Sequence, residues 1–182
     1  MLNNQQIIIS GLGGQGVLFI TKLLAGAAMA DNLPVLTSET HGMAQRGGNV
    51  ISYLKIGDFS GPLIRPATAD ALIALKAESF AHHSYFLKPG GLAVVNSPDP
   101  VEDDRYRVFC GNATALAEEA GNVRSENVAM LGFFMGAIKD DTPVFNPDTL
   151  ARMIKEKFQA KPAVATNVLS LLEAGMQLYQ KR

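Results

Sequence analysis

A glycine-rich turn near the start of the chain constrains the fold more than any other feature. It has the sequence GLGGQG from Gly11 to Gly16, follows the apolar run 6–9 and precedes an apolar helical pattern over 17–30. This strand–turn–helix context is what makes a G-x-G-x-x-G pattern meaningful. Without a Cβ in the way, backbone N–H groups at the start of a helix can approach an anion, and the helix dipole favours negative charge there. The turn therefore predicts a site for a phosphate-bearing ligand, with close packing of strand against helix as the alternative role.

Length and composition indicate one globular domain. The chain has 182 residues, of which 47% are hydrophobic and 18% are charged, and this suits a single compact unit. The formal net charge is −1 and no basic patch is visible, so we expect no nucleic-acid partner. We see no secretory signal and no uninterrupted apolar run of membrane-spanning length, and therefore expect a cytoplasmic protein without a membrane partner.

The cysteine and histidine content argues against a metal centre in this chain. Cys110 is the single cysteine, so an internal disulfide and a protein-bound iron–sulfur cluster, which needs several thiolates, are both excluded. We expect Cys110 to be a small buried thiol at the end of a strand. His82 and His83 have no further ligand at a convincing spacing, so no metal site is predicted there.

Strand and helix patterns alternate in the first two thirds of the chain, and the remainder is helical. Strands are expected at 5–10, 34–38, 49–56, 70–75, 92–96 and 105–110, and helices at 14–31, 77–86, 112–120, 125–139, 147–157 and 162–180. This order predicts a three-layer, Rossmann-like α/β domain with a mainly parallel sheet and C-terminal helices. We take 1–182 as one domain, with an α/β part of about 1–122 and a helical part of about 123–182. The pattern 128–138 is apolar nearly all round, which suggests that a partner subunit covers it.

A second group of polar residues lies in the loop between the second and third expected strands. This loop, 38–48, contains Glu39, His41, Gln45 and Arg46 and ends in two glycines, of which Gly47 is the first. The Arg46 guanidinium offers a fixed fork of donors for a carboxylate or phosphate, and the glycines allow close backbone approach. Ligands of open α/β sheets gather beyond the carboxyl ends of the strands. We therefore expect this loop and the glycine turn to share one pocket.

Two of these side chains have alternative interpretations. Glu39 lies where a dinucleotide fold places the acid that binds the ribose, about 20 residues past the turn. Glu39 is equally suited to pair with Arg46. His41 is either a general base or a structural hydrogen-bonding group.

Several catalytic patterns are missing from the sequence. It contains no G-x-x-x-x-G-K-[ST] phosphate loop, no nucleophile elbow, and no pair of carboxylates placed for acid–base catalysis. The sequence therefore predicts a chain that binds and positions, with no catalytic residue of its own.

The two motifs together resemble a known family. The segments GLGGQGV (11–17) and HGMAQRGG (41–48) resemble those of the gamma subunit of 2-oxoacid:ferredoxin oxidoreductases, and the beta subunit of indolepyruvate ferredoxin oxidoreductase is similar. The likeness spans nearly the whole chain and includes Asn127, Leu131, Gly132 and Asn167 in the helical part. Neither motif departs much from the family pattern.

The resemblance implies an accessory subunit of a larger enzyme. The family's reaction is coenzyme-A-dependent oxidative decarboxylation of a 2-oxoacid, with electrons passed to ferredoxin. Sibling alpha, beta and ferredoxin-like subunits would hold the thiamine diphosphate, Mg and iron–sulfur clusters, and this chain lacks the thiamine-binding G-D-G…N-N pattern. Its own role would be to help bind CoA and close the active site, and it is a possible homodimer when isolated. The residues predicted at the CoA site are Gly11, Gly13, Gly14, Gln15, Gly16, Glu39, His41, Gln45, Arg46 and Gly47.

Some questions stay open from the sequence. Pyruvate, 2-oxoglutarate, branched-chain and aryl 2-oxoacids are all possible substrates. A stand-alone NAD(P)-dependent oxidoreductase using the same turn, with Glu39 on the ribose, is one alternative function. A nucleotide-sensing or scaffold domain is another.

Overall fold

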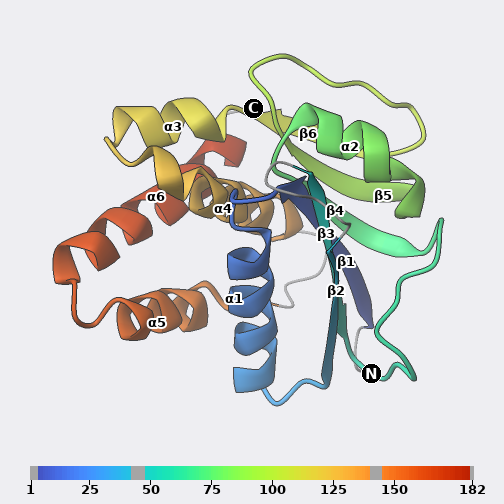
Figure 1. The fold of residues 1–182 in the computed structure, drawn as a ribbon, viewed down its shortest axis with the longest axis horizontal. Coiled ribbons are helices and arrows are strands. Elements are labelled where there is room, and N and C mark those ends of the chain that lie inside the picture. Colours follow the sequence, from blue (N-terminus) through green and yellow to red (C-terminus); the bar gives the residue numbers. More distant parts are fainter. Residues whose placement is uncertain (1–3, 42–47, 140–144, 181–182) are drawn as a thin grey trace.

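The fold is built on a six-stranded sheet with the order β2-β3-β1-β4-β5-β6 (Figure 1). The computed structural model describes residues 4–41, 48–139 and 145–180, without the side chains of residues 40 and 41. The strands are β1 (Gln5–Leu12), β2 (Val35–His41), β3 (Asn49–Ile56), β4 (Ala69–Ala74), β5 (Leu87–Asn96) and β6 (Arg107–Gly111). The helices are α1 (Val17–Ala30), α2 (Ala77–His83), α3 (Ala113–Glu119), α4 (Glu126–Ile138), α5 (Pro147–Lys157) and α6 (Pro162–Gln180). Short 3₁₀ turns η1 (Ser84–Phe86) and η2 (Val123–Ser125) follow α2 and precede α4.

The sheet is mainly parallel, as expected. Strand β1 pairs in parallel with β4, β4 with β5, and β5 with β6. Strand β3 is antiparallel to both β1 and β2, so β2 points the same way as β1 although β3 lies between them. All carboxyl ends except that of β3 therefore meet at one edge of the sheet.

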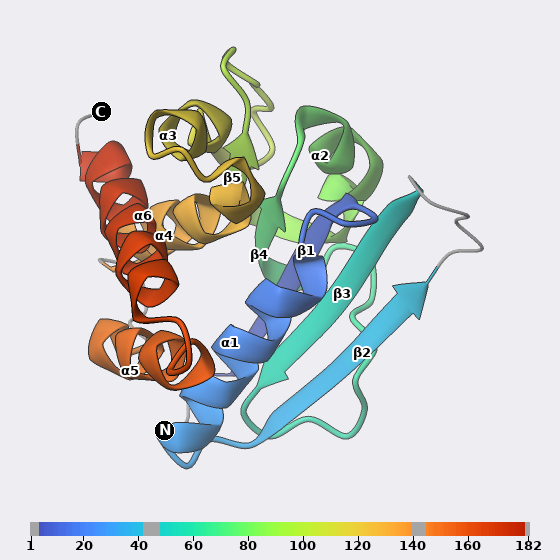
Figure 2. The same ribbon diagram turned by 60° about the vertical axis from the view of Figure 1, so that its left-hand side comes forward.

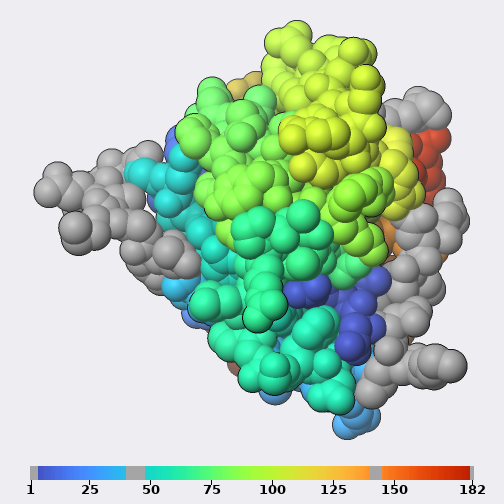
Figure 3. Space-filling model, turned by 90° about the vertical axis from the view of Figure 1, so that its right-hand side faces the viewer, coloured from blue at the N-terminus to red at the C-terminus, as the bar shows by residue number. Residues whose placement is uncertain are grey.

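The two faces of the sheet are covered unequally. Helices α1 and α4 lie on one face, with α3, α5 and α6 packed around them (Figures 1 and 2). The other face carries α2, η1 and the connections 57–68 and 97–106, which face the viewer in Figure 3. Strand β1 shows the consequence in its sequence, because Ile7 and Ile9 enter the helical core while Ile8 enters the core on the α2 side. A strand buried on both faces is apolar at consecutive positions instead of alternating.

Helix α4 is covered by the chain itself, which corrects the expectation of a partner on its apolar surface. Residues 127–138 are all buried, and α4 contacts α6, α3, α1 and the sheet. Glycines permit the close crossing with α6: a Cβ on Gly132 would overlap the carbonyl oxygen of Leu172, and one on Gly175 that of Ala129. The prediction of a subunit contact here was wrong because α6 supplies the apolar partner that the helix requires.

The observed elements differ from the expected ones mainly at their ends. Strand β1 extends beyond the expected end at Ser10, because its pairing with β3 continues to Leu12. Strand β5 begins at Leu87, so the Pro–Gly–Gly stretch that we expected to precede it lies within it. Cys110 is buried at 6% exposure, as predicted. In the described part of the chain, no helix has both the length and the apolarity needed to cross a membrane.

Candidate functional site

The glycine turn joins the end of β1 to the start of α1 and lies at the same end of the sheet as α2 and α3 (Figure 2). Gly14 and Gly16 adopt φ values of 96° and 84°, which L side chains rarely tolerate. A Cβ on Gly16 would also overlap the side-chain amide of Asn127, whereas a Cβ on Gly14 would meet no heavy atom within 4 Å. Gly16 thus allows close packing against α4, and Gly14 borders open space at an exposed turn.

Gln15 shapes this turn from inside. Its Oε1 accepts a hydrogen bond from the Leu12 backbone N–H at 2.7 Å. Its Nε2 donates to Glu126 Oε1 at 3.0 Å and to the Leu75 carbonyl oxygen at 3.4 Å. The amide that we predicted as a ligand contact is therefore engaged within the protein, where it fastens the turn to β4 and α4.

The hydrogen-bond network continues from Glu126 across the carboxyl edge of the sheet. Thr114 Oγ1 donates to Glu126 Oε2 at 2.9 Å and accepts from Asn96 Nδ2 at 3.0 Å. Asn96 Oδ1 in turn accepts from the Ala113 backbone N–H at 3.0 Å. Sequence reasoning did not single out these residues. The signal that was available is that each polar side chain stands at the end of a buried strand or the start of a helix, where α/β folds gather ligands.

The second predicted motif meets the turn at one point within the described residues. The Gly13 backbone N–H donates to the Gly48 carbonyl oxygen at 3.0 Å, so the end of the loop lies against the glycine turn. Gln45, Arg46 and Gly47 lie outside the described residues, as does the His41 side chain. A shared pocket that includes Arg46 remains a prediction.

Glu39 is separated from the glycine turn by an intervening strand. It lies on β2 opposite Ser52 of β3, and Ser52 lies opposite Ile9 of β1. Two strand spacings, about 9–10 Å, therefore separate Glu39 from β1 at the level of the backbone. In a dinucleotide fold the strand with the ribose-binding acid is the direct neighbour of β1. The insertion of β3 disfavours that role for Glu39.

The histidine pair of α2 has a structural explanation. His83 Nδ1 lies 2.7 Å from Oγ of the buried Ser10, and this contact ties α2 to the end of β1. Burial lowers the pKa of His83, so the neutral ring is favoured. His82 Nδ1 bonds the Glu78 carbonyl oxygen at 2.6 Å. Among the described residues, no three His, Cys, Asp or Glu side chains are grouped so that they could hold a metal ion.

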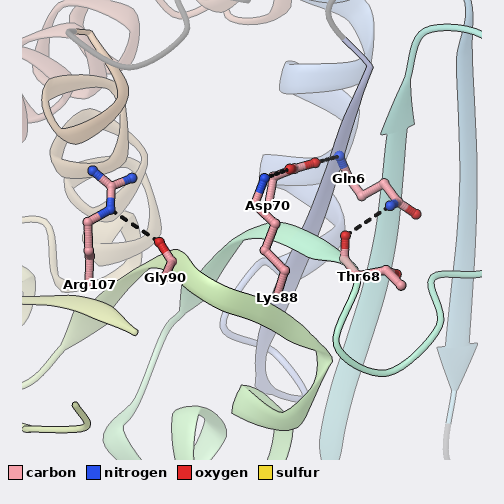
Figure 4. A network of polar contacts seen from close by, with 6 residues as sticks. All are labelled: Gln6, Thr68, Asp70, Lys88, Gly90 and Arg107. Carbon is pink, nitrogen blue, oxygen red and sulfur yellow. Dashed lines mark hydrogen bonds and ion pairs between the residues drawn. The ribbon is translucent and has the colours of Figure 1, made fainter. Parts of the chain in front are cut away.

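The opposite edge of the sheet carries a separate polar network (Figure 4). Asp70 accepts from the Gln6 backbone N–H at 2.8 Å and pairs with Lys88 Nζ at 2.5 Å. Arg107 Nε donates to the Gly90 carbonyl oxygen at 3.3 Å. The cavity at these residues has a volume of only about 90 Å³. These contacts join the amino ends of β1, β4, β5 and β6, and they lie away from the glycine turn.

A larger cleft opens at the carboxyl edge, between α2 and α3. Its volume is about 510 Å³, within the range of about 300–1,000 Å³ that small-molecule sites span. Its walls come from the start of α2, the residues after β5, and the start of α3. The lining residues are Lys76, Ala77, Glu78, Asn96, Ser97, Pro98, Asp99, Asn112, Thr114, Ala115, Glu118 and Glu126. The cleft thus shares Glu126 with the network that shapes the glycine turn.

Comparisons with known proteins identify the family of this chain. Residues 6–178 match the family model described as pyruvate ferredoxin/flavodoxin oxidoreductase. This chain belongs to that family. Indolepyruvate oxidoreductase subunit IorB of Archaeoglobus fulgidus is 38% identical over 151 residues, covering 71% of this chain and 75% of the relative. The resemblance drawn from the two motifs is confirmed.

Solved structures share the fold. The gamma subunit of a keto/oxoacid ferredoxin oxidoreductase from Geobacter sulfurreducens matches with a TM-score of 0.80 at 24% identity, over 98% of this chain and 99% of that one. The 2-oxoglutarate:ferredoxin oxidoreductase of Magnetococcus marinus, solved with 2-oxoglutarate, coenzyme A and succinyl-CoA, matches with a TM-score of 0.84 at 22% identity. That match covers 98% of this chain but only 31% of the other. This chain thus matches nearly the whole of the Geobacter sulfurreducens subunit and about a third of the Magnetococcus marinus chain.

Proposed function

We propose that this chain is the gamma-type accessory subunit of a cytoplasmic 2-oxoacid:ferredoxin oxidoreductase. In the overall reaction the bond between the carboxylate and the carbonyl carbon breaks and CO₂ leaves. The acyl group forms a thioester with the sulfur of CoA, and two electrons reduce ferredoxin. Thiamine diphosphate and iron–sulfur clusters in the sibling alpha, beta and ferredoxin-like subunits would supply the carbanion and redox chemistry. The family match over residues 6–178 supports this assignment.

The contribution that we assign to this chain is to bind the phosphates of CoA at the glycine turn. Gly13 and Gly14 are exposed, and open space borders Gly14. Beyond the turn, the first turn of α1 itself contains no acidic residue that would oppose an anion. The turn is pre-shaped by Gln15, which reduces the ordering that a ligand would have to impose. Arg46 would add a cationic contact from the loop that ends at Gly48.

The substrate is not assigned. The relative from Archaeoglobus fulgidus is named for indolepyruvate and the Magnetococcus marinus structure for 2-oxoglutarate, so chains of this type serve different 2-oxoacids. We expect the sibling subunits to form most of the 2-oxoacid pocket. Pyruvate is therefore one candidate among several.

Reconstitution of the complex tests the proposal. The chain would be co-expressed with the sibling subunits, and ferredoxin reduction would be followed with a panel of 2-oxoacids, with and without CoA. We expect CoA-dependent reduction with at least one 2-oxoacid, and its loss when this chain is left out. The assignment fails if the complex lacking this chain is fully active.

Ligand-dependent thermal stability distinguishes the alternative functions. CoA should raise the melting temperature by mass action, and NAD should not. Stabilisation by NAD alone would favour the stand-alone NAD(P) oxidoreductase. Size-exclusion chromatography of the isolated chain would show whether it forms the homodimer considered from the sequence.

A further inference from the structure

Strand β2 is an edge strand of the sheet, next to β3 (Figure 2). It spans seven residues and pairs with β3 in one continuous register from Val35 to His41. No described helix or strand lies beyond its outer edge. An edge strand of this kind presents a row of backbone N–H and C=O groups that can pair with another chain.

The pairing with β3 shows which backbone groups of β2 face outward. The Gly57 N–H donates to the Pro34 carbonyl oxygen at 2.8 Å, and these two residues continue the register of β2 with β3. Hydrogen-bonded and non-hydrogen-bonded pairs alternate along an antiparallel ladder. The N–H and C=O groups of Leu36 therefore point toward β3, and those of Val35 and Thr37 point outward. Among the described residues, these outward groups of Val35 and Thr37 have no hydrogen-bond partner.

Strand β2 has none of the usual protection against such pairing. Natural edge strands are commonly guarded by proline, by lysine and other charged side chains, by a bulge or by short length. Residues 35–41 contain neither proline nor lysine, and their pairing with β3 has no bulge. The opposite edge strand, β6, spans only five residues and begins with the exposed, charged Arg107. Strand β2 is therefore the edge that is better suited to accept another strand.

Leu36 adds an apolar group at this edge. It lies opposite Lys55 of β3 on the sheet face that carries α2, and its side chain is half-buried. Within the described residues, Leu36 packs against neither of the two hydrophobic cores. A leucine in this position gains free energy from an apolar neighbour supplied from beyond the edge, because the neighbour removes its exposed surface from water.

We propose that β2 pairs in the antiparallel sense with β2 of a second copy of this chain, about a two-fold axis at Leu36. The two Leu36 side chains then face each other as a non-hydrogen-bonded pair, with Cα atoms about 4.5 Å apart. Val35 of each copy exchanges its outward hydrogen bonds with Thr37 of the other. Glu39, the only carboxylate of β2, lies about 20 Å along the strand from its counterpart, so like charges do not meet. The strand is thus complementary to itself, as a two-fold dimer requires.

Sedimentation equilibrium of the isolated chain tests this pairing. We expect a dimer with a dissociation constant in the micromolar range, because the interface is small. Thr37→Pro removes an outward N–H and no bond to β3, so the variant should fold and its dissociation constant should rise at least about tenfold. Thr37→Val keeps the N–H and is the matched control, which should dimerise like the wild type. A wild-type chain that stays monomeric at about 0.1 mM would overturn the proposal.

Disulfide cross-linking tests the register. Cys110, the only native cysteine, is buried, so an introduced exposed thiol is the one that reacts. Leu36→Cys places two thiols at a separation that a disulfide spans, and mild oxidation should give covalent dimers. Ser38→Cys lies on the same face and is the control, because its two copies lie about 13 Å apart along the strand and should not cross-link.

The two experiments together decide the proposal. Equal cross-linking of Leu36→Cys and Ser38→Cys, or a dimer unaffected by Thr37→Pro, would overturn it. Should Thr37→Pro fail to fold, as its far-ultraviolet circular dichroism would show, the cross-linking comparison decides alone. The pairing does not depend on the proposed function, so its failure would leave the CoA-dependent activity of the reconstituted complex unchanged.

Discussion

Removal of the Glu126 carboxylate should loosen the glycine turn, because Glu126 bonds to Gln15 of the turn although it lies far from it in the sequence. Both carboxylate oxygens are engaged, one by Gln15 and the other by Thr114. A hydrogen bond to a charged group contributes about 1.5–3 kcal/mol to stability. Glu126 is half-buried, and its two donors can reach water once it is gone, so each of the two bonds should contribute only about 1 kcal/mol, below that range. We expect Glu126→Ala to lower the free energy of unfolding by about 2 kcal/mol, or the melting temperature by roughly 4–8 °C for a chain of this size.

The matched variants separate hydrogen bonding from side-chain volume. Glu126→Gln keeps an acceptor for one of the two donors, so it should cost about 1 kcal/mol. Glu119→Ala, at the exposed end of α3, should change stability by less than about 0.5 kcal/mol. The measurement is urea unfolding at neutral pH, with the slopes compared so that a change in the unfolded state is recognised.

A double-mutant cycle addresses the coupling directly. Gln15→Ala and Glu126→Ala should be non-additive by about 1 kcal/mol, because each single change already breaks their shared bond. The reasoning is refuted if Glu126→Ala is as stable as Glu119→Ala, or if the two changes are additive. Either result would mean that water replaces these hydrogen bonds without loss.

Three further predictions concern backbone space and pH. Gly16→Ala should lower the free energy of unfolding, measured with urea, by at least about 1 kcal/mol more than Gly14→Ala does. Both substitutions strain a positive φ, but only the one at Gly16 overlaps a neighbouring side chain. Equal losses of stability would contradict the packing described. Gly132→Ala should lower the free energy of unfolding by about 1–3 kcal/mol, since the added methyl group overlaps the α6 backbone. A melting temperature equal to that of the wild type would show that the two helices do not cross so closely. Because burial lowers the pKa of His83, the unfolded state binds its proton more readily, so part of the stability is lost as the pH falls below 6.5. Urea titrations at several pH values should show that His83→Gln loses less stability on acidification than the wild type, and that His82→Gln loses as much. Identical pH profiles of stability for His83→Gln and the wild type would contradict this.

Much of the fold could be predicted from local sequence. The apolar run of β1 indicated a strand, and the helices expected from Pro147 and Pro162 begin at those residues as α5 and α6. The end of β1 could not be predicted, because its last two residues are held in the sheet by pairing with β3, far along the chain. The interpretation of α4 failed for a similar reason: an all-round apolar helix shows that it needs cover, and does not show whether the cover is α6 or another protein.

The candidate site likewise has features that the sequence predicts and features that depend on contacts between distant parts of the chain. The sequence by itself determined that residues 11–16 form a glycine turn between a strand and a helix, since φ values near +90° require glycine whatever surrounds them. Only the tertiary structure decided that Gln15 bonds inward and that β3 separates Glu39 from the turn. The physical reason is that a residue's backbone conformation is a local property. Its partners depend on strand order and helix crossing, which bring together residues as far apart in the chain as Gln15 and Glu126.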